Sequence, residues 1–135
     1  MAIEYEWRGE LTSAEANVLH AECFGHRVLT DAEWDWRGQV EGHSLGWVCA
    51  RDGGVLVGFV NVAWDGVVHA FVLDTMVATR ARRHGVGTRL VEIAVERARV
   101  AGCEWLHVDF DEHLRGFYFD ACGFTPTPAG LIALK

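Results

Sequence analysis

One stretch decides the fold of this chain: Asp74-Thr75-Met76-Val77-Ala78-Thr79-Arg80-Ala81-Arg82-Arg83-His84-Gly85-Val86-Gly87-Thr88-Arg89-Leu90. It contains the end of an apolar strand, an arginine-rich loop, and two spaced glycines that open an amphipathic helix. The start of a helix favours anions because its backbone N–H groups are unpaired and its dipole is positive there. Glycines let phosphate oxygens approach that backbone closely. The pattern predicts a pyrophosphate cradle; the simpler alternative is a strand-to-helix loop flanked by solvated arginines.

The composition limits the kinds of ligand that such a cradle could bind. The chain has 135 residues, of which 50% are hydrophobic and 23% are charged. This predicts a single folded domain over residues 1–135. A formal net charge of -7 argues against nucleic-acid or membrane-surface partners, which require a basic field. The local arginines therefore point to a small anionic ligand.

The cysteines and the hydropathy pattern bear on metals and compartment. Cys23, Cys49, Cys103 and Cys122 are scattered, with no Cys-x-x-Cys pair. We therefore predict no metal site and expect reduced, buried thiols. No apolar run approaches the roughly 20 residues that span a bilayer, and the first residues lack a signal-peptide pattern. We expect a cytoplasmic protein.

The residues before the decisive stretch predict a strand, two helices and then hairpins. Apolar and polar side chains alternate over residues 3–8, as in a half-buried strand. Capping-box spacing predicts one helix from Thr12 to about Cys23 and a second from Thr30 to Gly42. The three strands expected next are Trp47–Arg51, Val55–Trp64 and Val67–Val77, joined by Asp-Gly turns.

The residues after the stretch predict a crossover. Apolar side chains recur at helical spacing from Val86 to Ala101, and a strand is expected over Trp105–Phe110. A strand, a helix and a further strand in this order predict one parallel pairing. A short helix over Leu114–Cys122 and a closing strand over Leu131–Leu134 complete the chain. The expected fold class is α/β with a mixed sheet, an antiparallel meander plus one parallel step, and ligands favour the carboxyl ends of such parallel strands.

Two common glycine loops do not match. A phosphate-binding loop of the hydrolase type needs a lysine after its last glycine, but Thr88 follows Gly87. A dinucleotide-binding loop needs a third glycine where Leu90 stands. Asp109 lies near the position of the ribose-binding acid, yet one crossover after several hairpins does not make a doubly wound sheet.

The run Arg82-Arg83-His84-Gly85-Val86-Gly87 has the form Arg-x-x-Gly-x-Gly and resembles the signature of the GNAT N-acetyltransferase superfamily. The resemblance implies an acetyl-CoA-binding fold whose last two long strands splay apart to admit the thioester. It implies pyrophosphate binding by the signature and main-chain pairing of the preceding strand with the pantetheine arm. The residues implied to bind acetyl-CoA are Met76, Val77, Ala78, Arg82, Arg83, His84, Gly85, Val86, Gly87 and Thr88.

Acetyl transfer to an amine needs a group that removes the ammonium proton and one that protonates the departing thiolate. Tyr118 is the candidate acid, although the usual Tyr-x-x-x-Gly-Phe pattern of the superfamily would place Phe119 at the tyrosine position. A core or cofactor-packing tyrosine is the alternative. Asp74 is the candidate base or counter-charge for the acceptor; the alternative is a carboxylate hydrogen-bonded within the sheet.

Other polar and aromatic residues are weaker candidates for the same site. Histidines on neighbouring strands are more often structural than catalytic, acids after a strand are usually solvated, and one of two nearby tryptophans is expected in the core. These residues are His69, His107, Asp109, Asp111, Glu112, Trp34 and Trp36.

The resemblance implies an acetyl-CoA-dependent N-acetyltransferase acting on a small-molecule, peptide or protein amine. A noncatalytic acyl-CoA-binding or sensing module is the alternative, motivated by the displaced tyrosine. A nucleotide-binding interaction domain is a third hypothesis. The acceptor cannot be identified from the sequence, and a homodimer is compatible with families of this kind.

Overall fold

A five-stranded sheet organises the computed structural model, which describes all 135 residues. The strands lie in the order β1-β2-β3-β4-β5; neighbours from β1 to β4 are antiparallel, and β5 runs parallel to β4. Their bounds are β1 Ile3–Trp7, β2 Ser44–Asp52, β3 Val55–Trp64, β4 His69–Val77 and β5 Trp105–His107. The predicted α/β fold, a mixed sheet with one parallel step, is confirmed.

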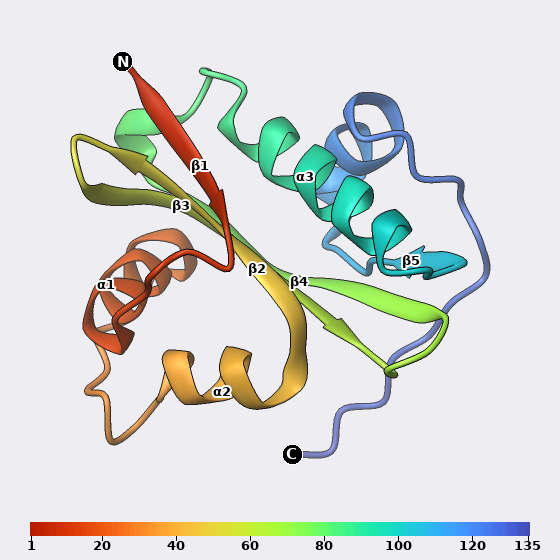
Figure 1. Ribbon diagram of the computed structural model, residues 1–135, viewed down its shortest axis with the longest axis horizontal. Helices are drawn as coiled ribbons and strands as arrows, with labels where there is room; N and C mark the ends of the chain where they lie inside the picture. Colours follow the sequence, from red (N-terminus) through yellow and green to blue (C-terminus); the bar gives the residue numbers. More distant parts are fainter.

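Helices cover both faces of this sheet. Figure 1 shows α3 on one face and α1 and α2 on the other. The α-helices are α1 Ser13–Phe24, α2 Trp36–His43 and α3 Val86–Val100; the shorter turns are η1 Thr79–Ala81, η2 Glu112–Leu114 and η3 Gly116–Ala121. None of the helices combines the length and apolar character needed to cross a bilayer.

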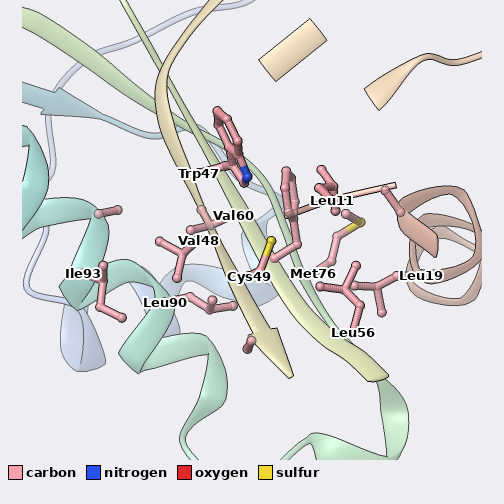
Figure 2. Close-up of a cluster of buried hydrophobic side chains, with 14 of the residues drawn as sticks. Leu11, Leu19, Trp47, Val48, Cys49, Leu56, Val60, Met76, Leu90 and Ile93 are labelled. Carbon is pink, nitrogen blue, oxygen red and sulfur yellow. The ribbon is translucent and has the colours of Figure 1, made fainter. Parts of the chain in front are cut away.

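The core consists of two apolar layers on either side of the central strands (Figure 2). On one side, Val48 and Val60 lie toward Leu90 of α3. On the other side, Met76 lies toward Leu19 of α1. The predicted apolar stripe of α3 is largely confirmed, because its fully buried members include Val86, Leu90, Val91, Ala94 and Ala98.

The start of α1 is held by a capping box and an ion pair. The Thr12 hydroxyl accepts from the backbone N–H of Glu15, and the Glu15 carboxylate accepts from the backbone N–H of Thr12. Arg51 of β2 also donates to both oxygens of Glu15, at 2.7 and 2.9 Å. Hydrogen bonding by Arg51 lowers the pKa of Glu15 below its ordinary value. One side chain therefore ties a helix start to the sheet.

Replacing Glu15 by glutamine tests this tie. Glutamine can still accept the capping hydrogen bond, so any loss of stability measures the Glu15–Arg51 ion pair. We expect the free energy of unfolding to be about 1 kcal/mol lower at pH 7. The folded-state pKa of Glu15 is depressed, so its contribution is present above the unfolded pKa and is lost as the pH falls through the folded pKa. Thermal unfolding should show a gap between the two proteins at pH 7 that closes in acid. A gap independent of pH would contradict this.

The second helix begins later than predicted. Thr30 and Glu33 do exchange capping hydrogen bonds, but these close only a short turn. The α2 helix starts at Trp36, because the Asp35 carboxylate caps the backbone N–H of Gly38 and accepts from the hydroxyl of Ser13. The later cap is tied to α1, which the local sequence does not reveal.

The C-terminal part differs most from the prediction. Strand β5 ends at His107 instead of Phe110, and Leu131–Leu134 form no strand. The apolar side chains of this last segment are more than four-fifths exposed. An added strand needs an edge with which to pair, and β5 offers only three paired residues. The short helix predicted over Leu114–Cys122 is present but irregular, because it consists of the 3-10 helix η2 and the π-helix η3.

Candidate active site

The start of α3 leaves its backbone donors free. None of the N–H groups from Arg83 to Thr88 donates a well-formed hydrogen bond within the chain, and the cap residue Gly85 provides no side-chain cap. By contrast, Thr12 and Asp35 cap α1 and α2. Free N–H groups and a positive dipole favour a bound anion. The residues present therefore fit a pyrophosphate group.

The loop before α3 has an unusual backbone. Gly85 has φ +72°, and Arg83 has φ +66°, a region that side chains other than glycine rarely enter. The side chains of Arg83 and His84 are exposed and make no ion pair within the chain. Arg82 instead donates through Nε to the carbonyl of Val77, at 3.3 Å. The loop thus presents cationic side chains beside the free amides.

Three elements meet at Gly87. A side chain at this position would lie 3.2 Å from the ring of Phe117 in η3 and 3.7 Å from Val77 of β4. Glycine fits this position closely, since even a methyl group would require the Phe117 ring to shift slightly. The start of α3, the end of β4 and the η3 turn are therefore in direct contact.

The backbone at the end of β4 is partly engaged. The carbonyl of Val77 accepts from Arg82 and from the thiol of Cys23, at 3.3 and 3.4 Å. Ala78 donates its N–H to Val57 and accepts from Ala81. Met76 has its side chain in the core. Pairing of these residues with a pantetheine arm stays a prediction, and Ala78 already uses both backbone groups.

Strand β4 contains a bulge beside the parallel step. Phe59 pairs with Met76 and Asn61 pairs with Leu73, so two residues of β4, Asp74 and Thr75, lie opposite one residue of β3. Asp74 has φ +56°. Such bulges bend a strand and re-aim its side chains. The bulge lies beyond Phe71, the last residue of β4 that pairs with β5.

The bulge leaves Asp74 partly buried. Its carboxylate takes part in none of the hydrogen bonds or ion pairs of the chain, and burial alone raises its pKa above the usual value. The alternative of a carboxylate hydrogen-bonded within the sheet is therefore not what the structure has. A strained, partly buried acid without partners is typical of functional sites.

Tyr118 is directed at the same bulge. It is the buried residue of η3, and its hydroxyl donates to Oγ1 of Thr75 at 3.2 Å. Its ring stacks on Phe110 at 4.8 Å. Burial raises the pKa of Tyr118 above its ordinary value, while the hydrogen bond with Thr75 acts in the opposite direction. Tyr118 of η3 thus contacts β4 at Thr75, the bulge residue next to Asp74 and beyond the part of β4 that pairs with β5.

Comparisons with known proteins agree with this geometry. The sequence profile described as "Acetyltransferase (GNAT) family" matches residues 13–124. The chain belongs to the GNAT acetyltransferase family. No curated protein matches the sequence.

Solved structures of low sequence identity share the GNAT fold. A probable acetyltransferase of unknown function from meticillin-resistant Staphylococcus aureus has a TM-score of 0.80 at 18% identity, covering 99% of both chains. Glucosamine-6-phosphate N-acetyltransferase from Arabidopsis thaliana has a TM-score of 0.75 at 17% identity, covering 96% of this chain and 97% of that one. AAC(6')-Iy, in complex with a bisubstrate analog containing CoA, has a TM-score of 0.75 at 17% identity, covering 100% and 99%.

The η3 turn explains the tyrosine spacing that departs from the GNAT pattern. η3 is a π-helix, and the N–H of Cys122 bonds to the carbonyl of Phe117, five residues earlier. This wider turn absorbs the extra residue between Tyr118 and Gly123. Phe119 instead lies against Phe110 and under the guanidinium of Arg115. Tyr118, and not Phe119, is the residue that faces β4.

The remaining predicted candidates lie around the bulge or farther away in this GNAT domain. His69 and His107 contact each other through ring nitrogens 2.8 Å apart, where β4 and β5 still pair. Asp109, Asp111 and Glu112 are exposed in the segment after β5. The two histidines therefore lie before the bulge, whereas Asp109 is near enough to Tyr118 to raise the pKa of its phenol.

The two tryptophans have different roles. Trp36 is fully buried, and its Nε1 donates to Oδ1 of Asn17 at 2.9 Å. Trp34 is half-buried and stacks on Trp36 at 4.4 Å. Sequence reasoning missed that His20 of α1 packs against both rings and contacts His26. Only an aromatic count in the α1–α2 region could have indicated this cluster.

A groove of about 1040 Å³ lies away from the bulge, between β1, the start of α1 and α2. Its arginines already have partners: Arg51 pairs with Glu15, Arg37 pairs with Glu41, and Arg8 donates to a backbone carbonyl. We assign this groove no chemistry, because its cationic side chains are already engaged within the chain.

Proposed function

We propose that the chain is an acetyl-CoA-dependent N-acetyltransferase that acts on a primary amine. The observation that carries the proposal is the uncapped start of α3, where the amides from Arg83 to Thr88 are free. Backbone donors at a helix start are suited to a pyrophosphate. Membership of the GNAT family supports acetyl-CoA as the donor substrate.

The proposed reaction is a direct attack in a ternary complex. The amine nitrogen forms a bond to the thioester carbonyl carbon, and the carbon–sulfur bond breaks. The ammonium proton passes to Asp74, the second proton that the nitrogen loses as the amide forms passes to solvent, and the CoA thiolate takes a proton from Tyr118. A backbone N–H near Met76 polarises the carbonyl oxygen. The raised pKa of Asp74 supports its role, because a base works best when its pKa lies closer to the working pH.

The acceptor is proposed as a small-molecule or peptide amine. A net charge of -7 favours a cationic acceptor over an anionic one. Nucleic acids and membranes are not proposed as partners. Exposed apolar residues on β4 and in the last segment, Phe71 and Leu131 among them, are compatible with a homodimer.

A panel of amines tests the proposal. Purified protein is incubated with acetyl-CoA and polyamines, aminoglycosides, amino sugars, amino acids or lysine peptides, and free CoA thiol is measured. Thiol release with at least one amine, together with acetylated product by mass spectrometry, supports the enzyme. Tight acetyl-CoA binding without any turnover would instead support the sensing module. Stronger thermal stabilisation by ATP or NAD than by acetyl-CoA would point to a nucleotide-binding domain.

Replacing Thr88 by glutamate tests the cradle separately. Thr88 is the third residue of α3, where an acidic side chain stabilises the helix dipole by about 0.3–1 kcal/mol. The same charge should repel the pyrophosphate, so we expect at least tenfold weaker acetyl-CoA binding by calorimetry.

The matched control for this charge is Thr88→Gln, which has the same size and no charge. Misfolding cannot raise the stability of Thr88→Glu while it weakens binding, so the opposite signs are diagnostic. Equal acetyl-CoA affinity in the glutamate and glutamine variants would place the pyrophosphate elsewhere.

A further inference from the structure

Two irregular elements face each other in this fold. The β4 strand has one residue more than its partner at Asp74 and Thr75, and η3 is wound as a π-helix around Tyr118. Both kinds of irregularity interrupt regular hydrogen bonding, and both occur frequently at functional sites. The hydrogen bond from Tyr118 to Thr75, at 3.2 Å, joins the two.

Different residues fix the position of the Tyr118 ring and the direction of its hydroxyl. Phe110 stacks on the ring, and Phe117 and Phe124 meet it edge-on, at centroid distances of 4.8 and 5.9 Å. These aromatic side chains hold the ring but offer no hydrogen-bond partner to its O–H group. Thr75 is the one side chain of the protein that hydrogen-bonds to the Tyr118 hydroxyl.

We propose that Thr75 is a positioning residue for Tyr118. Its hydroxyl holds the phenol beside the part of β4 that does not pair with β5. It also stabilises the phenolate that forms when Tyr118 has given up its proton. The proposal rests on the proposed function, in which Tyr118 protonates the departing CoA thiolate.

The protons balance in this scheme. The Tyr118 O–H proton moves to the CoA sulfur, and the carbon–sulfur bonding pair stays on that sulfur. The Thr75 hydroxyl rotates and donates to the phenolate oxygen, and it keeps its own proton. Solvent then returns a proton to Tyr118. A threonine hydroxyl can serve in both states because it accepts as well as donates.

A threonine that only filled space in the bulge would have no effect on the pKa of Tyr118. Hydrogen bonding by Thr75 lowers the pKa of Tyr118 against the stronger effect of burial, so losing the hydroxyl should raise that pKa. The other titratable groups near the phenol are Cys122 on the same turn and Asp109 after β5, and both raise the pKa. Neither is altered by a change at Thr75.

The experiment uses tyrosine labelled at the ring carbon that bears oxygen. The chain has two tyrosines, so a Tyr5→Phe background leaves Tyr118 as the single resonance. Titration by NMR is compared among this background, Thr75→Val and Thr75→Ser. We expect the midpoint to move upward in the valine variant and to stay near the parent value in the serine variant.

The same proteins are then assayed with the best amine of the panel. We expect kcat to fall about tenfold in Thr75→Val, the effect of one hydrogen bond to a charged group, with an unchanged KM for acetyl-CoA. Thr75→Ser should recover most of the rate. Serine preserves the hydroxyl and also shows whether the bulge tolerates substitution.

Two results would overturn the proposal. The first is an unchanged Tyr118 titration in Thr75→Val, and the second is a shifted titration with unchanged kcat. Failure of the proposed function is distinguishable, because the wild-type protein would then transfer no acetyl group to any amine. In that case the titration would still report the Thr75–Tyr118 hydrogen bond. Without acetyl transfer, however, Thr75 could have no positioning role in that reaction.

Discussion

Replacing Tyr118 by phenylalanine is expected to lower kcat about a hundredfold with little change in the KM for acetyl-CoA. A positioned general acid contributes roughly 10²–10⁴-fold, and a thiolate leaves with less assistance than an alkoxide, which places the expected loss at the lower end. Phenylalanine preserves the stacking on Phe110 and the contacts with Phe117 and Phe124. The substitution therefore removes the hydroxyl and little else.

The control is the second tyrosine of the chain. Tyr5 lies on β1, at the far edge of the sheet from β5, so Tyr5→Phe should leave kcat unchanged. Steady-state rates of both variants, with thermal unfolding as a check of the fold, make the comparison. If Tyr118→Phe turned over like the wild type, Tyr118 would be a packing residue and the thiolate would leave unassisted or be protonated by water.

Replacing Asp74 by asparagine is expected to lower kcat at least a hundredfold at neutral pH and, at the same time, to raise the melting temperature. Asparagine is the matched substitution because it tolerates the positive φ that Asp74 adopts. The loss of rate follows from the loss of the base. The gain in stability follows from removal of a charge that partial burial disfavours and that no hydrogen bond or ion pair within the chain offsets.

The pH dependence of stability has a definite sign. Burial raises the folded-state pKa of Asp74 above its unfolded value, so its favourable contribution is complete below the unfolded pKa. That contribution is lost as the pH rises through the folded pKa. The wild type should therefore lose stability relative to Asp74→Asn across this window, while its activity rises across the same window.

Differential scanning calorimetry and pH–rate profiles measure the two effects. Glu96→Gln, on the exposed face of α3, is the control for loss of one negative charge and should change neither quantity. An Asp74→Asn protein that is fully active would show that another group removes the ammonium proton. One that is less stable than the wild type would show that the carboxylate has a stabilising partner.

Local patterns were sufficient for most of the framework. The two hairpins, the capping box of Thr12 and Glu15, and the apolar stripe of α3 depend on residues close in sequence, and the structure confirms each of them. The turns themselves differ from the predicted Asp-Gly pairs: Gly53 and Gly54 form the first, and residues 65–68 form the second. The order of strands followed from these elements, because short turns force antiparallel neighbours and a crossover helix permits a parallel one. The loop before α3 was also visible as a motif, since its glycines and arginines are adjacent.

Predictions failed where a distant segment decided the outcome. The helix expected from Thr30 starts at Trp36 because Asp35 is also bonded to Ser13 of α1. The expected strand over Leu131–Leu134 does not form, because the segment pairs with no edge of the sheet and its apolar side chains stay exposed. Local propensity indicates that an element is permitted, whereas pairing requires a partner elsewhere in the chain.

The sequence by itself determined the mixed sheet, the parallel step and the anion-favouring start of α3, because hydrophobic periodicity and turn chemistry act over a few residues. Only the tertiary structure decided which aromatic residue faces β4. The bulge at Asp74 and the π-turn around Tyr118 each hold one extra residue, and packing across 43 residues of sequence brings Tyr118 to Thr75. No local pattern encodes such a contact, because it exists only when the two irregular elements are folded against each other.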